Sequence, residues 1–416
     1  MKMIKNNSAV MADTTSDLWE KMNKLTVGEC FFQIRNGANI KQGVADGGFP
    51  ITRIETIAND RFNRDRMGYA GITDADKYRS YILEDGDLLM SHINSVQYLG
   101  RTVLYHKQEN EKIIHGMNLL AMKANRDILS PAYAQYYFRS IPFREQIRKI
   151  TKKSVNQASF TVSDLKKIPI QVPSLLEQRN AVETLDRVNK LLELHQHQLQ
   201  TLDELVKARF VEMFGDESNP YNFPIVSIED VASVQVGVVI KPAQYYTDAD
   251  HGIKTFRSLN IGPMHIKDTD WVYFSEEGNR KNQKSVLNEN DLVIVRSGAP
   301  GTACVITKEY AGCNAVDIII ARPDLGKVNP YYLCQYTNLP HGKKQIEEGT
   351  GGAAQQHFNV GKYNKIRLTL PPLDQQLKFE KFVEQTDKSK LAIQQSLDKL
   401  KTLRKSLMQE YYGQGE

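Results

Sequence analysis

The feature that most constrains this 416-residue chain is an internal repeat of about sixty residues. Residues 157–173 (QASFTVSDLKKIPIQVP) and residues 355–371 (QQHFNVGKYNKIRLTLP) align without a gap. A segment that recurs in order and without insertion predicts two copies of one structural unit. The matched positions are Gln157/Gln355, Phe160/Phe358, Val162/Val360, Lys167/Lys365, Ile168/Ile366 and Pro173/Pro371, and the register continues through Gln178/Gln376 to Phe214/Tyr412.

Upstream of each copy the match is looser, but its order is kept, as loop insertions would produce. The paired positions are Gly37/Gly237, Lys41/Lys241, Arg53/Arg257, Asp87/Asp291, Gly116-x-Asn118/Gly312-x-Asn314 and Pro131/Pro330. We therefore expect a domain and a helix, each present twice. The predicted parts are an N-terminal extension at residues 1–24, a first domain at 25–172, a helix at 173–215, a second domain at 216–370 and a second helix at 371–416.

The second half of each copy is typical of a long helix. Pro173 and Pro371 stand where a helix would begin, and proline is tolerated in a first turn because those N–H groups need no partner. A seven-residue apolar spacing follows in the first copy at Leu185, Leu192, Leu199, Val206 and Met213. A helix this long cannot bury such a stripe alone. We therefore predict that the two helices pack together as an antiparallel coiled coil.

The first half of each copy indicates mixed secondary structure. Apolar runs at 88–90, 292–295 and 316–321 predict strands. Ser130-Pro131 and Asn329-Pro330 predict the starts of short aromatic-rich helices. The predicted fold class is α+β, with two mixed α/β domains joined by the two long helices.

Composition and charge narrow the class of protein. The net charge of +5 is compatible with nucleic-acid binding but does not establish it, and the run 144–153 (REQIRKITKK) is locally basic. No apolar stretch approaches the length of a membrane span. The four cysteines show no CxxC spacing, which favours a reducing compartment, and we predict a cytoplasmic protein.

The motifs that resemble catalytic sites have simpler explanations. The Asn329-Pro330-Tyr331-Tyr332 run resembles the loop with which adenine methyltransferases hold a flipped base, but it lacks the middle proline and no glycine-rich cofactor turn precedes it. Helix capping is the better interpretation. The acidic pairs Asp85/Asp87 and Glu289/Asp291 fit turns before strands better than a nuclease site. No histidine spacing suits a metal. We predict no catalytic residue, no metal and no cofactor.

The repeated Phe-x-Val, Lys-Ile and Pro positions, followed by a long helix, resemble the repeat of Type I restriction–modification specificity subunits. Gly86-Asp87-Leu88-Leu89 followed by Gly100, and Asp291-Leu292 followed by Gly298 and Gly301, resemble it as well. The resemblance covers the chain from about residue 25 onward. It implies two target-recognition domains that each read one half of a split DNA sequence, and a helical spacer that sets the gap.

The same resemblance implies the partners. They are double-stranded DNA, two adenine methyltransferase subunits that use S-adenosylmethionine, and a restriction translocase–nuclease subunit, with no membrane. Two alternatives stay open: a specificity subunit of a related two-subunit restriction enzyme, or a self-sufficient adenine DNA methyltransferase.

Phosphate contacts need Lys or Arg, and contacts to base edges favour Arg, Lys, Asn or Gln. In the first domain we expect DNA contacts in the polar stretch 59–66 and in the loop 91–99. In the second domain we expect them near Arg257, which matches Arg53 in the repeat, and around residues 296–297. The candidate DNA-binding residues are Arg53, Asn59, Arg61, Asn63, Arg64, Arg66, His92, Asn94, Gln97, Arg257, Arg280, Lys281, Arg296 and Ser297.

Overall fold

The computed structural model describes residues 24–43, 47–154, 157–350 and 358–413. The chain forms two compact units. The first unit runs to Leu194 and also takes in the chain from Leu397 onward, and the second unit is His195–Ser396. The predicted N-terminal extension, up to residue 23, and Gln355 of the repeat lie outside the described residues.

The first unit is built around a four-stranded antiparallel sheet with the order β2-β6-β3-β5. Helices α3 and α4 pack on one face through a core that includes Tyr133, Phe138 and Phe143. The strands and helices of the domain are β1 (Lys24–Thr26), α2 (Val27–Cys30), β2 (Phe31–Asn36), β3 (Leu88–Ser91), β4 (Ile93–Asn94), β5 (Thr102–Leu104), β6 (Leu119–Ala124), α3 (Pro131–Arg139), α4 (Ile141–Ile150), β7 (Lys152–Lys153), β8 (Ala158–Ser159), α5 (Val162–Lys166) and β9 (Pro169–Gln171).

The second unit has a four-stranded antiparallel sheet with the order β11-β20-β17-β18, and a further sheet β12-β16-β13-β19. Its elements are β10 (Ile225–Ser227), α7 (Ile228–Val231), β11 (Ala232–Val236), β12 (Tyr246–Thr247), β13 (Ile253–Phe256), β14 (Ile261–Gly262), β15 (His265–Ile266), β16 (Val272–Phe274), α8 (Glu276–Lys281), β17 (Leu292–Val295), β18 (Ala303–Val305), β19 (Asn314–Ala315), β20 (Ile318–Pro323), α9 (Pro330–Asn338), α10 (Pro340–Thr350), α11 (Val360–Asn364) and β21 (Arg367–Thr369).

The two main sheets are copies of one another. The register of β3 with β6 pairs Leu88 with Met122, and the register of β17 with β20 pairs Leu292 with Ala321. One pair of our sequence alignment is wrong. Gly116 bridges Ala38 and Val316 bridges Val238, so the structural counterpart of Gly116 is Val316 and not Gly312. The loops before these positions differ in length, which allowed a chance match of Gly-x-Asn.

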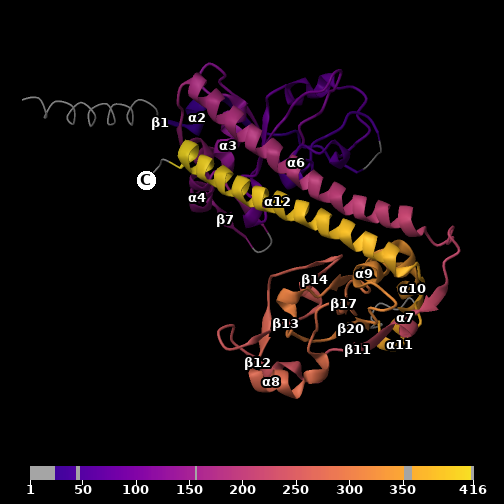
Figure 1. Ribbon diagram of the computed structural model, residues 1–416. Coiled ribbons are helices and arrows are strands. Elements are labelled where there is room, and N and C mark those ends of the chain that lie inside the picture. The colour runs from indigo at the N-terminus through magenta and orange to yellow at the C-terminus, as the bar shows by residue number, and fades with distance from the viewer. Residues whose placement is uncertain (1–23, 44–46, 155–156, 351–357, 414–416) are drawn as a thin grey trace, which may run out of the picture. The chain divides into compact units, whose positions relative to one another are not determined.

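Two forty-residue helices, α6 (Leu175–Phe214) and α12 (Leu373–Tyr412), follow the domains (Figure 1). Each begins two residues after the proline that we expected in its first turn. Ser174 instead forms the start of α6, because its hydroxyl and backbone N–H both donate to Glu177 Oε2, at 2.6 and 2.9 Å. The Glu177 N–H donates in return to Ser174 Oγ at 3.3 Å, and this reciprocal arrangement satisfies N–H groups that the helix leaves free.

The predicted apolar stripe of α6 faces inward. Ala181, Leu185, Val188 and Leu192 are buried in the first unit, and Val206 and Phe210 are buried in the second. Burial of a leucine or valine side chain contributes about 1.5–3 kcal/mol. These residues therefore stabilise each unit separately.

Contacts within the second unit give the direction of the helix pair. His195 Nε2 lies 2.9 Å from Ser396 Oγ, and Lys390 Nζ lies 2.7 Å from Asp203 Oδ1. Further along, the ring centroids of Phe210 and Phe379 are 5.3 Å apart. As the residue numbers of the contacts increase along α6, the residue numbers of their partners decrease along α12, so the two helices are antiparallel. The predicted fold class is confirmed.

A repeated glutamine joins each domain to the helix that follows it. Gln178 accepts from the Ser130 N–H at 2.8 Å and donates to the Ile128 and Pro173 carbonyls, both at 2.8 Å. Gln376 accepts from the Asn329 N–H at 2.7 Å and donates to the Lys327 and Pro371 carbonyls. Both glutamines are fully buried. The repeat therefore preserves a hydrogen-bonded clamp at the start of each long helix.

The far end of each long helix packs on the other domain's short helix. Tyr412, at the end of α12, lies 4.8 Å from Tyr133 of α3 between ring centroids. Phe214, at the end of α6, lies 4.8 Å from Tyr332 of α9. Phe214 and Tyr412 occupy matched positions of the repeat, so the two contacts are the same contact made twice.

Candidate nucleic-acid interface

In the first domain, the polar stretch 59–66 lies in two short turns, at Ile54–Asp60 and Arg64–Arg66. Asn59 and Asp60 adopt left-handed backbone angles, with φ of 58° and 56°, which turn the chain sharply. Arg53, Asn59, Arg61 and Arg66 are exposed there. The Arg53 guanidinium pairs with Glu55 at 3.3 Å, and that of Arg61 pairs with Glu193 at 2.6 Å. Exposed pairs of this kind contribute little to stability, so both cations remain accessible to a ligand.

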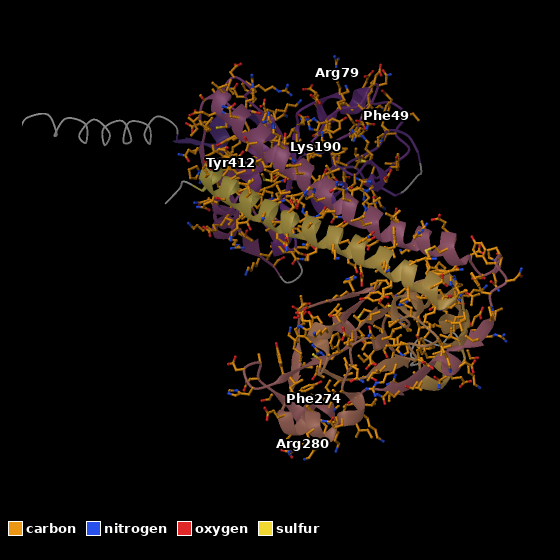
Figure 2. The ribbon with its side chains drawn as sticks, viewed as in Figure 1. Phe49, Arg79, Lys190, Phe274, Arg280 and Tyr412 are labelled. Atoms are coloured by element: carbon orange, nitrogen blue, oxygen red, sulfur yellow. The ribbon has the colours of Figure 1, made fainter. Side chains whose placement is uncertain are left out.

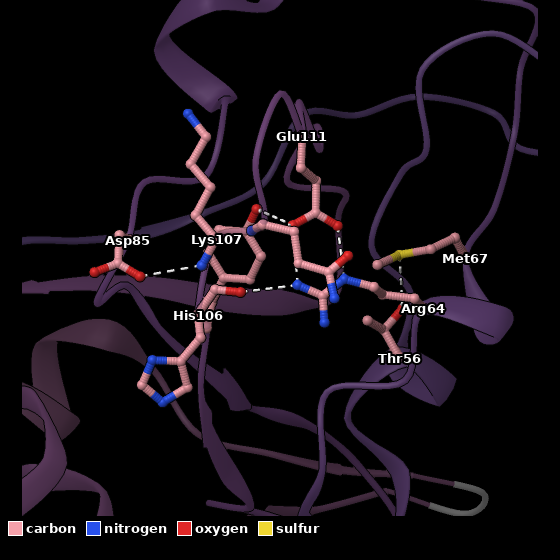
Figure 3. Close-up of polar contacts among 9 residues, drawn as sticks. Thr56, Arg64, Met67, Asp85, His106, Lys107 and Glu111 are labelled. Carbon is pink, nitrogen blue, oxygen red and sulfur yellow. Dashed lines mark hydrogen bonds and ion pairs between the residues drawn. The ribbon is translucent and has the colours of Figure 1, made fainter.

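Two predicted residues of this stretch are instead bound by the domain itself. Asn63 donates to the Ala58 carbonyl at 2.8 Å. Arg64 pairs with Glu111 at 2.7 Å and donates to the His106 carbonyl at 2.8 Å (Figure 3). The hydrogen bonds from Arg64, and then those from Gln108 and Tyr105, lower the pKa of Glu111 to about 2 despite some desolvation. Arg64 and Asn63 therefore hold the two turns in place.

The loop that follows β3 carries the other three predicted residues of this domain. His92 is buried, and burial lowers its pKa to about 4. Asn94 is half-buried and donates to Ser91 Oγ at 3.3 Å. Gln97 is exposed. Of the three, Gln97 has the accessibility that a direct contact with a ligand needs, and His92 has a packing position beside Phe160.

In the second domain the predicted residues also divide into two groups. Arg296 is largely buried, pairs with Asp317 at 2.5 Å and donates to the Phe358 carbonyl at 3.1 Å. Arg257 donates to the Asp270 carbonyl, and Ser297 is half-buried next to Arg296. Arg280 and Lys281 are exposed on α8, where Figure 2 labels Arg280. Lys281 makes a one-turn ion pair with Glu277, at 2.6 Å.

The structure adds two candidates that our sequence reasoning missed. Gln42 and Asn118 line a pocket of about 380 Å³ together with Arg53. Asn and Gln side chains match the hydrogen-bonding edge of adenine, and Arg matches that of guanine. The nearby repeat pair Lys41/Lys241 was the available signal, because it marked this loop without identifying the amide beside it.

The methyltransferase-like run is a helix cap. Asn329 Oδ1 accepts from the Tyr331 and Tyr332 N–H groups at 2.9 and 3.2 Å, and Asn329 Nδ2 donates to Glu380 at 2.9 Å. The Tyr332 hydroxyl donates to the Thr369 carbonyl at 2.5 Å. These polar groups are already used within the second unit, as the capping interpretation requires.

The acidic residues before the central strands likewise close turns. Asp87 accepts from the Glu84 N–H at 2.9 Å and lies 3.6 Å from Lys123. Asp291 accepts from the Asn288 N–H at 2.8 Å and pairs with Arg322 at 3.2 Å. Burial raises the pKa of both carboxyl groups. Within the described ranges no cluster of three or more potential metal ligands occurs, and none of the helices there is long and apolar enough to cross a membrane.

Comparisons with known proteins agree with this architecture. Residues 20–204 match the sequence model of the Type I restriction modification DNA specificity domain. A putative type I restriction enzyme MjaX specificity subunit from Methanocaldococcus jannaschii is 27% identical over 372 residues, which cover 85% of this chain and 84% of that protein.

Two solved structures share the fold. The Type I restriction–modification S subunit from M. genitalium is 14% identical, covers 93% of this chain and 95% of its own, and superposes with a TM-score of 0.57. A chain from a structural study of complex assembly and conformational transition in the type I R-M system is 17% identical, with coverage of 94% and 97% and a TM-score of 0.57. With the duplicated domain and the antiparallel helices, these comparisons show that the chain is similar to Type I restriction–modification specificity subunits along most of its length.

Proposed function

We propose that the chain is the DNA-reading subunit of a Type I restriction–modification complex, in which each domain reads one half of a bipartite target. The observation that carries this proposal is the duplicated sheet, β2-β6-β3-β5 and β11-β20-β17-β18, on two antiparallel helices. A sheet that is present twice in the chain suits a target with two separate halves.

The surfaces built on the two frames differ, as two different half-sites require. The first domain carries the turns of residues 54–66, whereas the second carries α8 with its exposed Arg280 and Lys281. The loops between the matched strands also differ, since residues 92–101 separate β3 from β5 and only residues 296–302 separate β17 from β18. Base-specific contacts depend on such side chains, so the two domains would recognise different sequences.

The long helices fit the proposed role of a spacer that sets the gap between half-sites and docks methyltransferase subunits. A continuous helix rises about 1.5 Å per residue, so its length is a fixed geometric quantity. The glutamine clamp at its start and the aromatic contact at its end fasten each helix to a domain. The separation of the half-sites would then follow from the helices.

In this proposal the subunit supplies recognition and its partners supply chemistry. Methyltransferase subunits would bring S-adenosylmethionine, and a translocase–nuclease subunit would join for cleavage. The occupied hydrogen bonds of Asn329 argue against a base-holding loop in this chain. The self-sufficient methyltransferase is the less favoured alternative for that reason.

The decisive experiment exchanges residues 25–172 for those of a related specificity subunit with a known target. The full complex is then expressed in cells, and the methylated motif is determined by sequencing that detects modified adenine. We expect one half of the motif to change while the other half and the gap stay the same. A change in both halves would contradict the one-domain-per-half proposal.

Two further outcomes separate the alternatives. Methyl transfer to DNA by the purified chain alone would favour the self-sufficient methyltransferase. A single co-purifying partner that carries both nuclease and methyltransferase activity would favour the two-subunit restriction enzyme.

A further inference from the structure

A pocket of about 520 Å³ opens in the first unit between α4 and the loop after β4. We call it the α4 pocket. Its lining includes Ser95, Gln97, Leu99, Arg144, Ile147 and Arg148. The pocket is therefore bounded on one side by the loop in which we expect base contacts.

Two cations face this pocket from one helix. Arg144 and Arg148 lie four residues apart on α4, and side chains at that spacing are neighbours on one helix face. Both are exposed, and neither guanidinium makes a hydrogen bond or ion pair with any residue that the structure describes. Like charges one turn apart repel each other unless a negative group lies between them. The arrangement is suited to an anion.

The loop and the basic run 144–153 form one connected structure. Strand β8 pairs with β4, which begins the loop, and with β7, which follows α4. Lys152 and Lys153 of β7 are exposed. A group bound in the α4 pocket would therefore be held at a fixed distance from the loop, with more positive charge alongside.

The second domain has the same framework, but there the matched lysine is bound by the neighbouring loop. Gly100 and Gly301 are equivalent, since both have left-handed φ angles, of 73° and 75°, and face Ile147 and Ile346. By the same alignment Lys343 replaces Arg144, and Glu347 replaces Arg148. Lys343 Nζ donates to the Pro300 carbonyl at 3.0 Å and to Thr302 Oγ1 at 3.2 Å.

The difference between the two domains distinguishes a ligand site from an ordinary solvated surface. In the second domain the shorter loop accepts hydrogen bonds from Lys343, and the acidic residue Glu347 lies one helical turn later. In the first domain both matched positions are arginines, and both line the α4 pocket. The same framework can therefore be built without two arginines at these positions, as in the second domain, and the first domain differs by having both.

We propose that the α4 pocket binds a phosphodiester group of the DNA backbone, with Arg144 and Arg148 as positioning residues for the first domain. This proposal rests on the proposed DNA-reading function. The planar guanidinium fork matches phosphate oxygens in geometry and charge. A phosphate held here fixes the register of the loop over the bases without reading sequence itself.

The test uses the full chain and two DNA duplexes, one that carries the methylated motif and one of unrelated sequence. Binding is measured over a series of KCl concentrations for the wild type and for Arg144→Gln/Arg148→Gln. The slope of log K against log [KCl] should fall by about one for each phosphate that the protein no longer neutralises, hence by about one for the single phosphate of this site. Affinity for both duplexes should fall by a similar factor, because phosphate contacts carry no sequence information.

Two control variants accompany this one. Lys166→Gln/Lys167→Gln removes the same charge from exposed positions on and just after α5, and it should leave the slope near the wild-type value. Arg144→Lys/Arg148→Lys keeps the charge and should restore most of the slope, which excludes a folding defect as the cause.

The outcomes distinguish failure of the phosphate site from failure of the proposed function. An unchanged slope in the glutamine variant overturns the phosphate site and leaves the proposed function intact. Weaker binding of the motif duplex alone also overturns it, in favour of base contacts. Weaker methyltransferase binding with an unchanged slope overturns it in favour of a protein contact. If the wild-type chain shows no salt-dependent DNA binding, the proposed function fails and the phosphate site fails with it.

Discussion

Single buried polar residues connect the domains to the long helices. Gln178 and Gln376 each satisfy one backbone N–H and two carbonyls that would otherwise be buried without partners. A buried polar group left unsatisfied costs about 1–3 kcal/mol. Removing the side-chain amide at this position therefore costs more free energy of unfolding than the loss of its hydrogen bonds alone, because it also leaves buried backbone groups without partners.

We expect Gln178→Ala to lower the free energy of unfolding of the first unit by about 2–4 kcal/mol, because it strands several polar groups at once. Urea denaturation followed by circular dichroism measures this change. Gln198→Ala, at an exposed position of the same helix, should change stability by less than about 0.5 kcal/mol. Equal effects of the two substitutions would argue against the clamp.

Buried histidines make stability depend on pH. Burial lowers the pKa of both His92 and His115 to about 4, below the ordinary value of 6.5. Between these values the unfolded chain binds more protons than the folded one, so stability falls as pH falls from about 6.5 and the loss is complete near pH 4. His92→Gln should lose less stability across this range than the wild type, in unfolding measured at several pH values.

The matched control for the histidine prediction is His197→Gln, which removes an exposed histidine of α6. Its pH dependence should match that of the wild type. If His92→Gln also matched the wild type, the buried histidine would not be the source of the effect.

At the scale of elements, the ends of the long helices depend on aromatic packing. Phe214 is almost fully buried and contacts Phe210, Tyr332 and Phe379. Tyr412 makes the corresponding contact with Tyr133, and burial raises its pKa far above the ordinary value. Helix termini otherwise fray, so these contacts keep each helix ordered to its last turn.

Phe214→Ala should destabilise the second unit by about 3–5 kcal/mol, the cost of removing a buried phenylalanine. Hydrogen exchange should accelerate most in the last turns of α6. Val211→Ala, on the exposed side of the same turn, should leave exchange there nearly unchanged. Equal acceleration by both substitutions would contradict the prediction, because it would mean that the order of the helix end does not depend on the aromatic contact.

At the scale of the whole molecule, two domains with one frame and different surfaces predict separable recognition. Arg66→Ala in the first domain and Arg280→Ala in the second should each relax the methylated motif within one half only. Because each arginine acts in its own unit, the double variant should show the sum of the two effects. Sequencing of modified adenine across a library of target variants measures both halves together, and relaxation of both halves by one substitution would contradict the model.

The sequence predicted the fold better than it predicted the candidate site. Repeat spacing and the apolar stripe predicted the long helices, and apolar runs predicted β3 and β17. Among the candidate contact residues, arginine and asparagine looked alike in sequence, yet Arg64, Asn63 and Arg296 are bound to their own domains while Arg66 and Arg280 are exposed. The acidic partners of the two ion-paired arginines, Glu111 and Asp317, lie 47 and 21 residues away along the chain and leave no local pattern.

By itself, the sequence determined that the chain has two similar domains, each followed by a long amphipathic helix. Duplication and helical periodicity are properties of residue order, so they can be read along the chain. Only the tertiary structure decided that each helix ends on the other domain's short helix, and that the loop binds Lys343 in one copy while Arg144 lines the α4 pocket in the other. Those outcomes depend on which side chains meet across long sequence separations, where packing and hydrogen bonding select one partner among many of the same type.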